Sequence, residues 1–179
     1  ELKPAATQQV EIMAAAGADL IMLEMMIDID RMLEILEAAQ SSGLPVWVSL
    51  TIEDNDKGVL RSGELLADAV TMLDEFGADA KLLNCSKPEA ILASWSKMKS
   101  DQGLTGAYGN GFTSIDSLQP GGTVKSMESR SDLGPAAYAE FALQWANQGA
   151  ALIGGCCEVG PAHIKALARR LTEAGYSVE

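Results

Sequence analysis

The chain has 179 residues, 47% of them hydrophobic, so we expect a single domain over residues 1–179 with a sizeable buried core. A formal net charge of −12 is the wrong sign for binding nucleic acids or anionic membranes, and we expect neither partner. No apolar stretch approaches the roughly 18 residues of a membrane span and the first residues lack a signal-peptide core, so a reducing, cytoplasmic setting is expected.

Apolar runs of strand length alternate with Ala-, Leu- and Glu-rich segments of helix length, which is typical of βα units and a parallel sheet. The expected order begins with helix 5–16, strand 19–24, helix 28–40, strand 45–51, helix 64–76, strand 79–85, helix 88–99 and strand 104–108. It ends with helix 135–147, strand 150–155 and helix 161–174. The sequence therefore predicts five strands, each followed by a helix or a long loop.

The long segment 109–133 is rich in Gly, Ser, Thr and Asp and has neither the helical nor the strand period. A loop of this length inside a compact α/β chain is usually functional or disordered. Two interpretations stay open for it: a lid over a functional site, or a mobile surface loop.

The predicted strands are apolar on both faces, so both sides of the sheet should be covered. Two α/β folds satisfy this requirement, a doubly wound open sheet and a (β/α)8 barrel of the TIM type. In both folds the functional residues gather at the carboxyl ends of the strands. Reactive side chains at those ends are therefore candidates for a functional site.

All three cysteines of the chain stand at such positions: Cys85 closes strand 79–85, and Cys156 and Cys157 follow strand 150–155. Converging thiols can hold a soft metal; an all-sulfur set favours zinc, and three protein ligands leave the open position of a catalytic site. Two alternatives remain. Free cysteines are often small core residues, and the adjacent pair could form a redox-active vicinal disulfide.

Three further polar residues are candidates for functional roles. Glu24, at the end of strand 19–24, could accept hydrogen bonds from a substrate ammonium, or could be an acid stabilised by the dipole of helix 28–40. Asn110 could orient a substrate carboxylate or support a metal ligand, or could belong to an ordinary Asn-Gly turn. His163 is the only histidine, and we expect it to cap or flank the last helix rather than act as a general base.

Several of these residues form an ordered set that resembles the homocysteine S-methyltransferase family, which includes betaine-homocysteine methyltransferase and the homocysteine module of cobalamin-dependent methionine synthase. The set consists of Glu24, Asn84-Cys85, Gly154-Gly155-Cys156-Cys157 and Pro161-Ala162-His163-Ile164. The resemblance implies a (β/α)8 barrel in which Cys85, Cys156 and Cys157 hold zinc and homocysteine sulfur is the fourth ligand. It also implies that Glu24 binds the homocysteine ammonium and that Asn110, near the family's Asn turn, belongs to the substrate site.

The chain supplies five βα units, which match the fourth to eighth of the family's barrel. We therefore expect the carboxyl-terminal part of a homocysteine-binding barrel, with an unpaired strand at each edge. Such edges predict either a missing amino-terminal half or self-association of this chain.

The resemblance predicts zinc-dependent transfer of a methyl group to homocysteine, giving methionine. Betaine as donor calls for an aromatic cage, yet Met25 follows Glu24, so methyltetrahydrofolate, used directly or through cobalamin, and S-methylmethionine fit better. The alternatives are a catalytically silent zinc- or thiol-binding partial barrel and a vicinal-cysteine redox protein.

Overall fold

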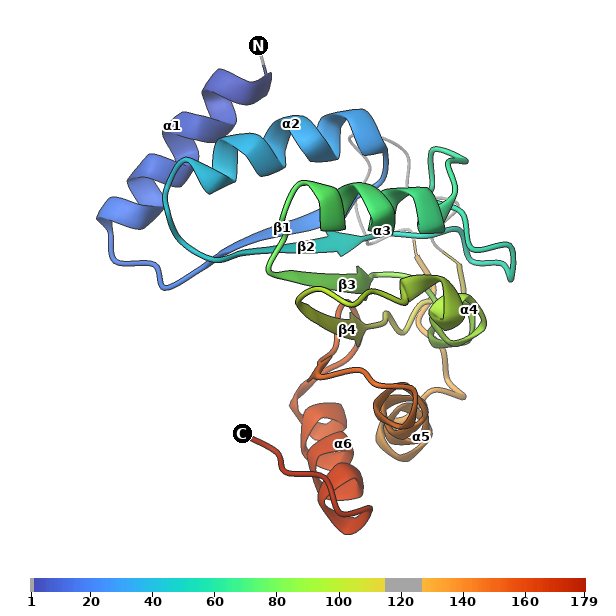
Figure 1. The fold of residues 1–179 in the computed structure, drawn as a ribbon. Helices are drawn as coiled ribbons and strands as arrows, with labels where there is room; N and C mark the ends of the chain where they lie inside the picture. The colour runs from blue at the N-terminus through green and yellow to red at the C-terminus, as the bar shows by residue number, and fades with distance from the viewer. Residues whose placement is uncertain (1, 115–126) are drawn as a thin grey trace.

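The computed structural model describes residues 2–114 and 127–179, in which six α-helices, one 3-10 helix and five strands alternate (Figure 1). The strands are β1 (Ile21–Met26), β2 (Val46–Leu50), β3 (Ala80–Asn84), β4 (Leu104–Tyr108) and β5 (Leu152–Ile153). The helices are α1 (Leu2–Ala15), α2 (Ile29–Gln40), α3 (Leu66–Glu75), α4 (Pro88–Ser94), the 3-10 helix η1 (Trp95–Met98), α5 (Pro135–Asn147) and α6 (Pro161–Glu173). None of these helices combines the length and the apolar character that a membrane span needs.

Neighbouring strands are parallel, and their order across the sheet, β1-β2-β3-β4-β5, is their order in the chain. A doubly wound sheet reverses its strand order at a switch point, whereas a barrel adds each strand beside the preceding one. The described strands therefore follow barrel topology, and the open-sheet alternative is wrong. In Figure 1 the arrowheads of β2, β3 and β4 point the same way, so the loops that follow them meet at one edge of the sheet.

The main hydrophobic core lies between the sheet and the helices that follow its strands. Leu36 of α2, Leu73 of α3 and Trp145 of α5 are fully buried in it. Leu83 of β3 also joins this core. Side chains alternate between the two faces of a strand, so the neighbouring β3 residues point to the opposite face.

That opposite face, here called the inner face, carries a second, smaller apolar cluster. The cluster consists of Ala80, Leu82 and Tyr108, with Met22, Trp47, Leu152 and Cys156 packed against it. Its peripheral members are only partly buried. In a closed barrel this face would line the interior, where strands on the far side would complete its burial.

Local sequence signals explain where several helices begin. The Asp28 carboxylate accepts a hydrogen bond from the Arg31 N–H at 2.9 Å and caps α2. Pro88 and Pro161 stand in the first turns of α4 and α6, where a missing N–H costs nothing. Gly77 follows α3 with φ of 76°, a left-handed conformation that glycine adopts without strain.

Most predicted elements agree with the structure, and strand 104–108 and helix 135–147 have identical bounds. Two predicted elements, strand 19–24 and helix 88–99, differ from the structure in their bounds or continuity. The strand predicted to end at Glu24 continues to Met26 through a register shift, and Met25 in that irregularity has φ of 61°. The helix predicted over 88–99 divides into α4 and η1.

The segment 109–133 is more ordered at its two ends than the sequence indicates. Phe112 and Ser129 form an antiparallel bridge, the Thr113 N–H donates to Glu128 O at 2.9 Å, and the Arg130 N–H donates to Gly111 O at 2.8 Å. We call residues 111–113 and 128–130 the loop base. Residues 115–126 lie outside the described residues, so the lid and surface-loop interpretations stay open.

Candidate metal centre

The three cysteines predicted to converge do so at the carboxyl edge of the sheet. Cys85 directly follows β3, and Cys156 and Cys157 follow β5. Their sulfur atoms all lie within 4.8 Å of one another, with 3.9 Å between Cys85 and Cys157 and 3.8 Å between Cys156 and Cys157. Cys85 is buried and the other two are half-buried, and all three are free thiols. The group is therefore compact and partly shielded from water.

The loop that follows β4 holds the adjacent pair in place through its main chain. The Cys156 N–H donates to Gly109 O at 2.9 Å, and the Gly111 N–H donates to Cys157 O at 2.8 Å. These two bonds attach both cysteines to residues two positions apart in one short segment. The pair therefore has a fixed position relative to β4.

The same segment fixes Cys85. The Cys85 N–H donates to Tyr108 O at 3.1 Å, and the Asn110 side chain donates from Nδ2 to Cys85 O at 2.8 Å. Cys85 has φ of 44°, which turns the chain sharply out of β3. All three thiols are thus positioned by residues 108–111, although they come from two distant parts of the sequence.

The thiols influence one another's protonation. A hydrogen bond from Cys85 lowers the pKa of Cys156 to about 6. The same hydrogen bond, together with burial, raises the pKa of Cys85 well above its ordinary range. Burial and the neighbouring Cys156 charge raise the pKa of Cys157. Without a cation the group thus favours one thiolate with two thiol neighbours.

A divalent cation among these sulfurs would remove the repulsion that opposes ionisation of all three. Their number, their element and their mutual proximity fit zinc bound by three thiolates, with one coordination position left for a ligand. The donor set does not fit magnesium or calcium, which prefer oxygen ligands.

Glu24 lies within β1 rather than at its end, and its side chain is exposed. Its Oε1 atom accepts a hydrogen bond from the Tyr108 hydroxyl at 3.1 Å. The negative charge of Glu24 is close enough to Cys156 to oppose ionisation of that thiol. Asp28 accepts the capping hydrogen bond at the start of α2, and Glu24 lies four residues before it, within β1.

Asn110 is fully buried, and both ends of its amide contact the main chain. Nδ2 donates to Cys85 O, and Oδ1 accepts from the Phe112 N–H at 3.0 Å. It is therefore more than an exposed turn residue. Its contacts join the loop after β4 to a predicted metal ligand.

Two residues of this region, Ser49 and Tyr108, were not predicted from the sequence. The Tyr108 hydroxyl oxygen lies 2.6 Å from Ser49 Oγ as well as near Glu24. Ser49 is fully buried within β2, between apolar neighbours. Two features of the sequence could have indicated them: Ser49 is a hydroxyl residue inside an apolar strand, and Tyr108 stands at the carboxyl end of its strand.

His163 has a structural place, as expected. Its Nδ1 atom accepts a hydrogen bond from the Gly160 N–H at 3.2 Å at the start of α6. That contact leaves the proton on Nε2, which lies 3.2 Å from Leu133 O and donates to it. Both ring nitrogens are thereby used to join α6 to the segment before α5.

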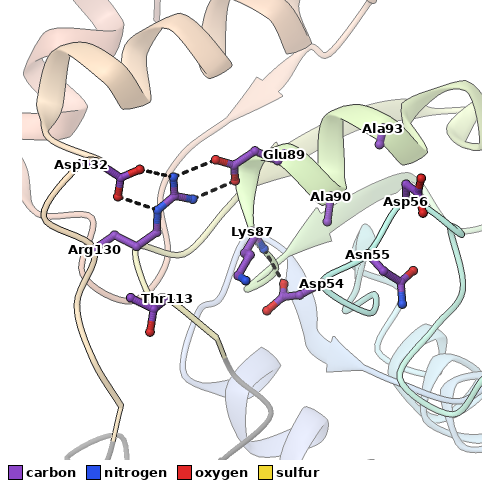
Figure 2. A pocket seen from close by; sticks show the side chains of 10 residues that line it. All are labelled: Asp54, Asn55, Asp56, Lys87, Glu89, Ala90, Ala93, Thr113, Arg130 and Asp132. Carbon is purple, nitrogen blue, oxygen red and sulfur yellow. Dashed lines mark hydrogen bonds and ion pairs between the residues drawn. The ribbon is translucent and has the colours of Figure 1, made fainter.

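A separate pocket of about 540 Å³ lies beside the loop base (Figure 2). Arg130 extends along its wall and pairs with both Glu89 oxygens at 2.8 Å and with Asp132 at 2.7 and 3.0 Å. On another side Asp54 accepts from the Lys87 main-chain N–H at 2.8 Å. The lining residues include neither Glu24 nor a cysteine, so this pocket is distinct from the thiol cluster.

Comparison with known proteins identifies the relatives of this arrangement. The sequence profile described as Homocysteine S-methyltransferase matches residues 1–171. The chain belongs to this family. Homocysteine S-methyltransferase 4 of Zea mays is 28% identical over 181 residues, a match that covers 98% of this chain and 51% of the maize protein. Homocysteine S-methyltransferase 1 of Brassica oleracea var. italica is 26% identical, covering 96% of this chain and 52% of the relative.

Solved structures support the same relationship. The apo form of the homocysteine methyltransferase MmuM from Escherichia coli matches with a TM-score of 0.71 at 25% identity, covering 94% of this chain and 56% of that one. Its metallated form matches with a TM-score of 0.70 at 25% identity, covering 94% and 52%. The family resemblance and the barrel class inferred from the sequence are confirmed. The chain spans about half the length of these relatives.

Proposed function

We propose that this chain is the metal-binding part of a zinc-dependent homocysteine S-methyltransferase, which methylates the thiol of homocysteine and yields methionine. The observation that carries the proposal is the convergence of Cys85, Cys156 and Cys157 within 4.8 Å at the carboxyl edge of the sheet. Family membership supplies the reaction class. Together they favour a site that activates a thiol rather than one that only binds metal.

Cys85, Cys156 and Cys157 would hold the zinc ion. Bound zinc lowers the pKa of a thiol in its open position, so that the substrate sulfur is a nucleophile at neutral pH. The substrate thiol would first lose its proton to solvent, and the sulfur–methyl bond would then form as the bond between the methyl group and its donor breaks. Partial burial of the cysteines limits competition from water.

The remaining residues orient the amino acid. Glu24 carries a carboxylate near Cys156 and is exposed, so it is free to accept hydrogen bonds from the ammonium group of homocysteine. Asn110 serves the site by holding the main chain of Cys85. In this assignment Glu24 recognises the substrate and Asn110 maintains the site.

Metal and ligand titrations of the purified 179-residue chain test the proposal. We expect about one zinc per chain by elemental analysis, as three thiolates provide one site. The zinc-loaded chain should bind homocysteine in calorimetry, and Cys156→Ser should lose most of the zinc together with homocysteine binding. A metal-free chain after purification with ample zinc would reject the site assignment.

The half-length match favours a second candidate, a partial barrel that binds zinc or thiols without catalysis. A methyl-transfer assay separates the two. The zinc-loaded chain is incubated with homocysteine and, in turn, S-methylmethionine, methyltetrahydrofolate, methylcobalamin and betaine, and methionine is measured by mass spectrometry. Formation of methionine supports the enzyme; zinc and homocysteine binding without methionine supports the silent barrel. Absence of zinc with reversible oxidation of Cys156 and Cys157 would support the redox alternative.

A further inference from the structure

We infer that Tyr108 is a positioning residue for Glu24, and that Ser49 orients the Tyr108 hydroxyl for this role. The inference deepens the proposed function and rests on it, because it concerns how the carboxylate that receives the homocysteine ammonium is held. Tyr108 itself is assigned no contact with the reacting atoms.

The three side chains meet across the inner face. Glu24 comes from β1, Ser49 from β2 and Tyr108 from the carboxyl end of β4, so the tyrosine reaches over the intervening β3. Its hydroxyl oxygen lies 3.1 Å from Glu24 Oε1 and 2.6 Å from Ser49 Oγ. The ring belongs to the inner-face cluster and is 9% exposed, so it cannot rotate freely.

The direction of these hydrogen bonds follows from the chemistry of the groups. An ionised carboxylate only accepts, so Tyr108 donates its one proton to Glu24. Ser49 must then donate its own proton to the Tyr108 oxygen. The ordinary pKa of a tyrosine hydroxyl is about 10, so the Tyr108 hydroxyl keeps its proton and donates it at neutral pH.

Glu24 needs such a constraint more than most glutamates do. It lies beside the irregularity at Met25, where the regular ladder between β1 and β2 is interrupted. Its side chain is exposed, so packing restricts its rotamer less than that of a buried residue. The charge-assisted hydrogen bond from the Tyr108 hydroxyl favours one rotamer of Glu24. Because the same ring packs against Cys156, it also fixes the carboxylate relative to the thiol cluster.

The inference predicts an effect that depends on the ligand's amino group. We compare homocysteine with 4-sulfanylbutanoic acid, which keeps the thiol and carboxylate but lacks the ammonium. In calorimetry with the zinc-loaded chain, Tyr108→Phe should weaken homocysteine binding about tenfold, the scale of a hydrogen bond to a charged group. Binding of 4-sulfanylbutanoic acid and zinc content should stay unchanged within error. Ser49→Ala should show the same selectivity with a smaller loss.

A double-mutant cycle separates positioning from a general structural effect. If Tyr108 acts through Glu24, the combination of Tyr108→Phe with Glu24→Gln should weaken homocysteine no more than Glu24→Gln alone. Tyr138→Phe is the matched control, because it removes a buried hydroxyl that lies 2.8 Å from Gly154 O and 3.2 Å from Gly109 O and does not contact Glu24. We expect any effect of Tyr138→Phe to be equal for the two ligands.

Each outcome decides the inference. Equal losses for both ligands in Tyr108→Phe, or additive losses in the cycle, would overturn it. Unchanged homocysteine binding by Tyr108→Phe, together with weaker binding by Glu24→Gln, would also overturn the inference. That result would still support the proposed function. A wild-type chain that binds zinc but no homocysteine overturns the proposed function and the inference together. Should Tyr108→Phe fail to fold, Ser49→Ala provides the same comparison.

Discussion

The side-chain amide of Asn110 donates a hydrogen bond to the carbonyl oxygen of Cys85 at 2.8 Å, across 25 positions of sequence. Cys85 has φ of 44°, so its carbonyl leaves the direction of the β3 ladder and needs a partner elsewhere. The other end of the amide accepts the Phe112 N–H at 3.0 Å. One buried side chain thus stabilises both the turn after β3 and the loop after β4.

Asn110→Ala should destabilise the fold and weaken metal binding. It leaves the Cys85 carbonyl and the Phe112 N–H without their partner, at roughly 1–3 kcal/mol for each buried group. Urea denaturation should therefore show a loss of about 2–6 kcal/mol in unfolding free energy, and competition with a chelator should show weaker zinc binding. Asn147→Ala is the matched control, because Asn147 is exposed and bonds only the Tyr176 hydroxyl in the described residues. Equal stability of the two variants would contradict the role given to Asn110.

Glu24→Gln should separate substrate binding from metal binding. The substitution keeps the size of the side chain but removes the charge assigned to the homocysteine ammonium. We expect homocysteine binding to weaken by roughly 1.5–3 kcal/mol, with zinc retained. Calorimetry and elemental analysis on the same sample measure both quantities. Unchanged affinity, or loss of zinc, would show that Glu24 has another role.

Arg130→Met should destabilise the chain more at neutral than at acid pH. Burial alone would raise the pKa of Glu89, but the hydrogen bonds and charge of Arg130 outweigh it and lower that pKa. The Arg130–Glu89 pair therefore contributes its full stabilisation of the fold above pH 4.5, the ordinary pKa of Glu. This stabilisation is lost as the pH falls through the lowered pKa of Glu89 in the folded chain. For this partly exposed pair we expect about 0.5–1 kcal/mol at neutral pH.

Thermal unfolding of wild type and Arg130→Met at several pH values measures this difference. Arg130→Lys is the control that keeps the charge but not the two-pronged contact with Glu89. A gap between wild type and Arg130→Met that is as wide below pH 4.5 as at neutral pH would exclude the ion pair as its cause.

The 179-residue chain on its own should self-associate. Among the described strands β1 and β5 each have one neighbour, and Met22, Trp47 and Leu152 of the inner face are only partly buried. Light scattering should show particles larger than a monomer, and Met22→Lys should shift them toward the monomer. Phe76→Lys, at a 47% exposed residue after α3, is the control and should have less effect. A compact monomer at all concentrations would refute the expectation.

The sequence predicted the elements and the meeting of the thiols because both depend on short-range patterns. Apolar runs located the strands, as for residues 104–108, and parallel strands bring their carboxyl ends to one edge. Once Cys85, Cys156 and Cys157 were assigned to such ends, their proximity followed. The strand order then decided between the two folds that the pattern allowed.

Features that depend on distant contacts were not predictable in this way. Tyr108 and Glu24 are 84 positions apart, and their hydrogen bond depends on how β1, β2 and β4 curve around β3. The irregularity at Met25 has no turn residue to mark it, because positive φ is unusual for methionine. The loop base likewise joins segments separated by residues that have no periodic pattern.

The chain has three cysteines, and all of them belong to the thiol cluster. A colorimetric thiol reagent therefore reports on this cluster alone, with no background from other parts of the protein. In an unfolded chain stripped of metal it should count three thiols. In the folded chain Cys156 should react first and buried Cys85 last, and metal binding should slow the reaction as the sulfurs become ligands. Thiol reactivity of the unmodified chain thus reports whether the metal site is occupied, and metal binding can be followed over time without a label.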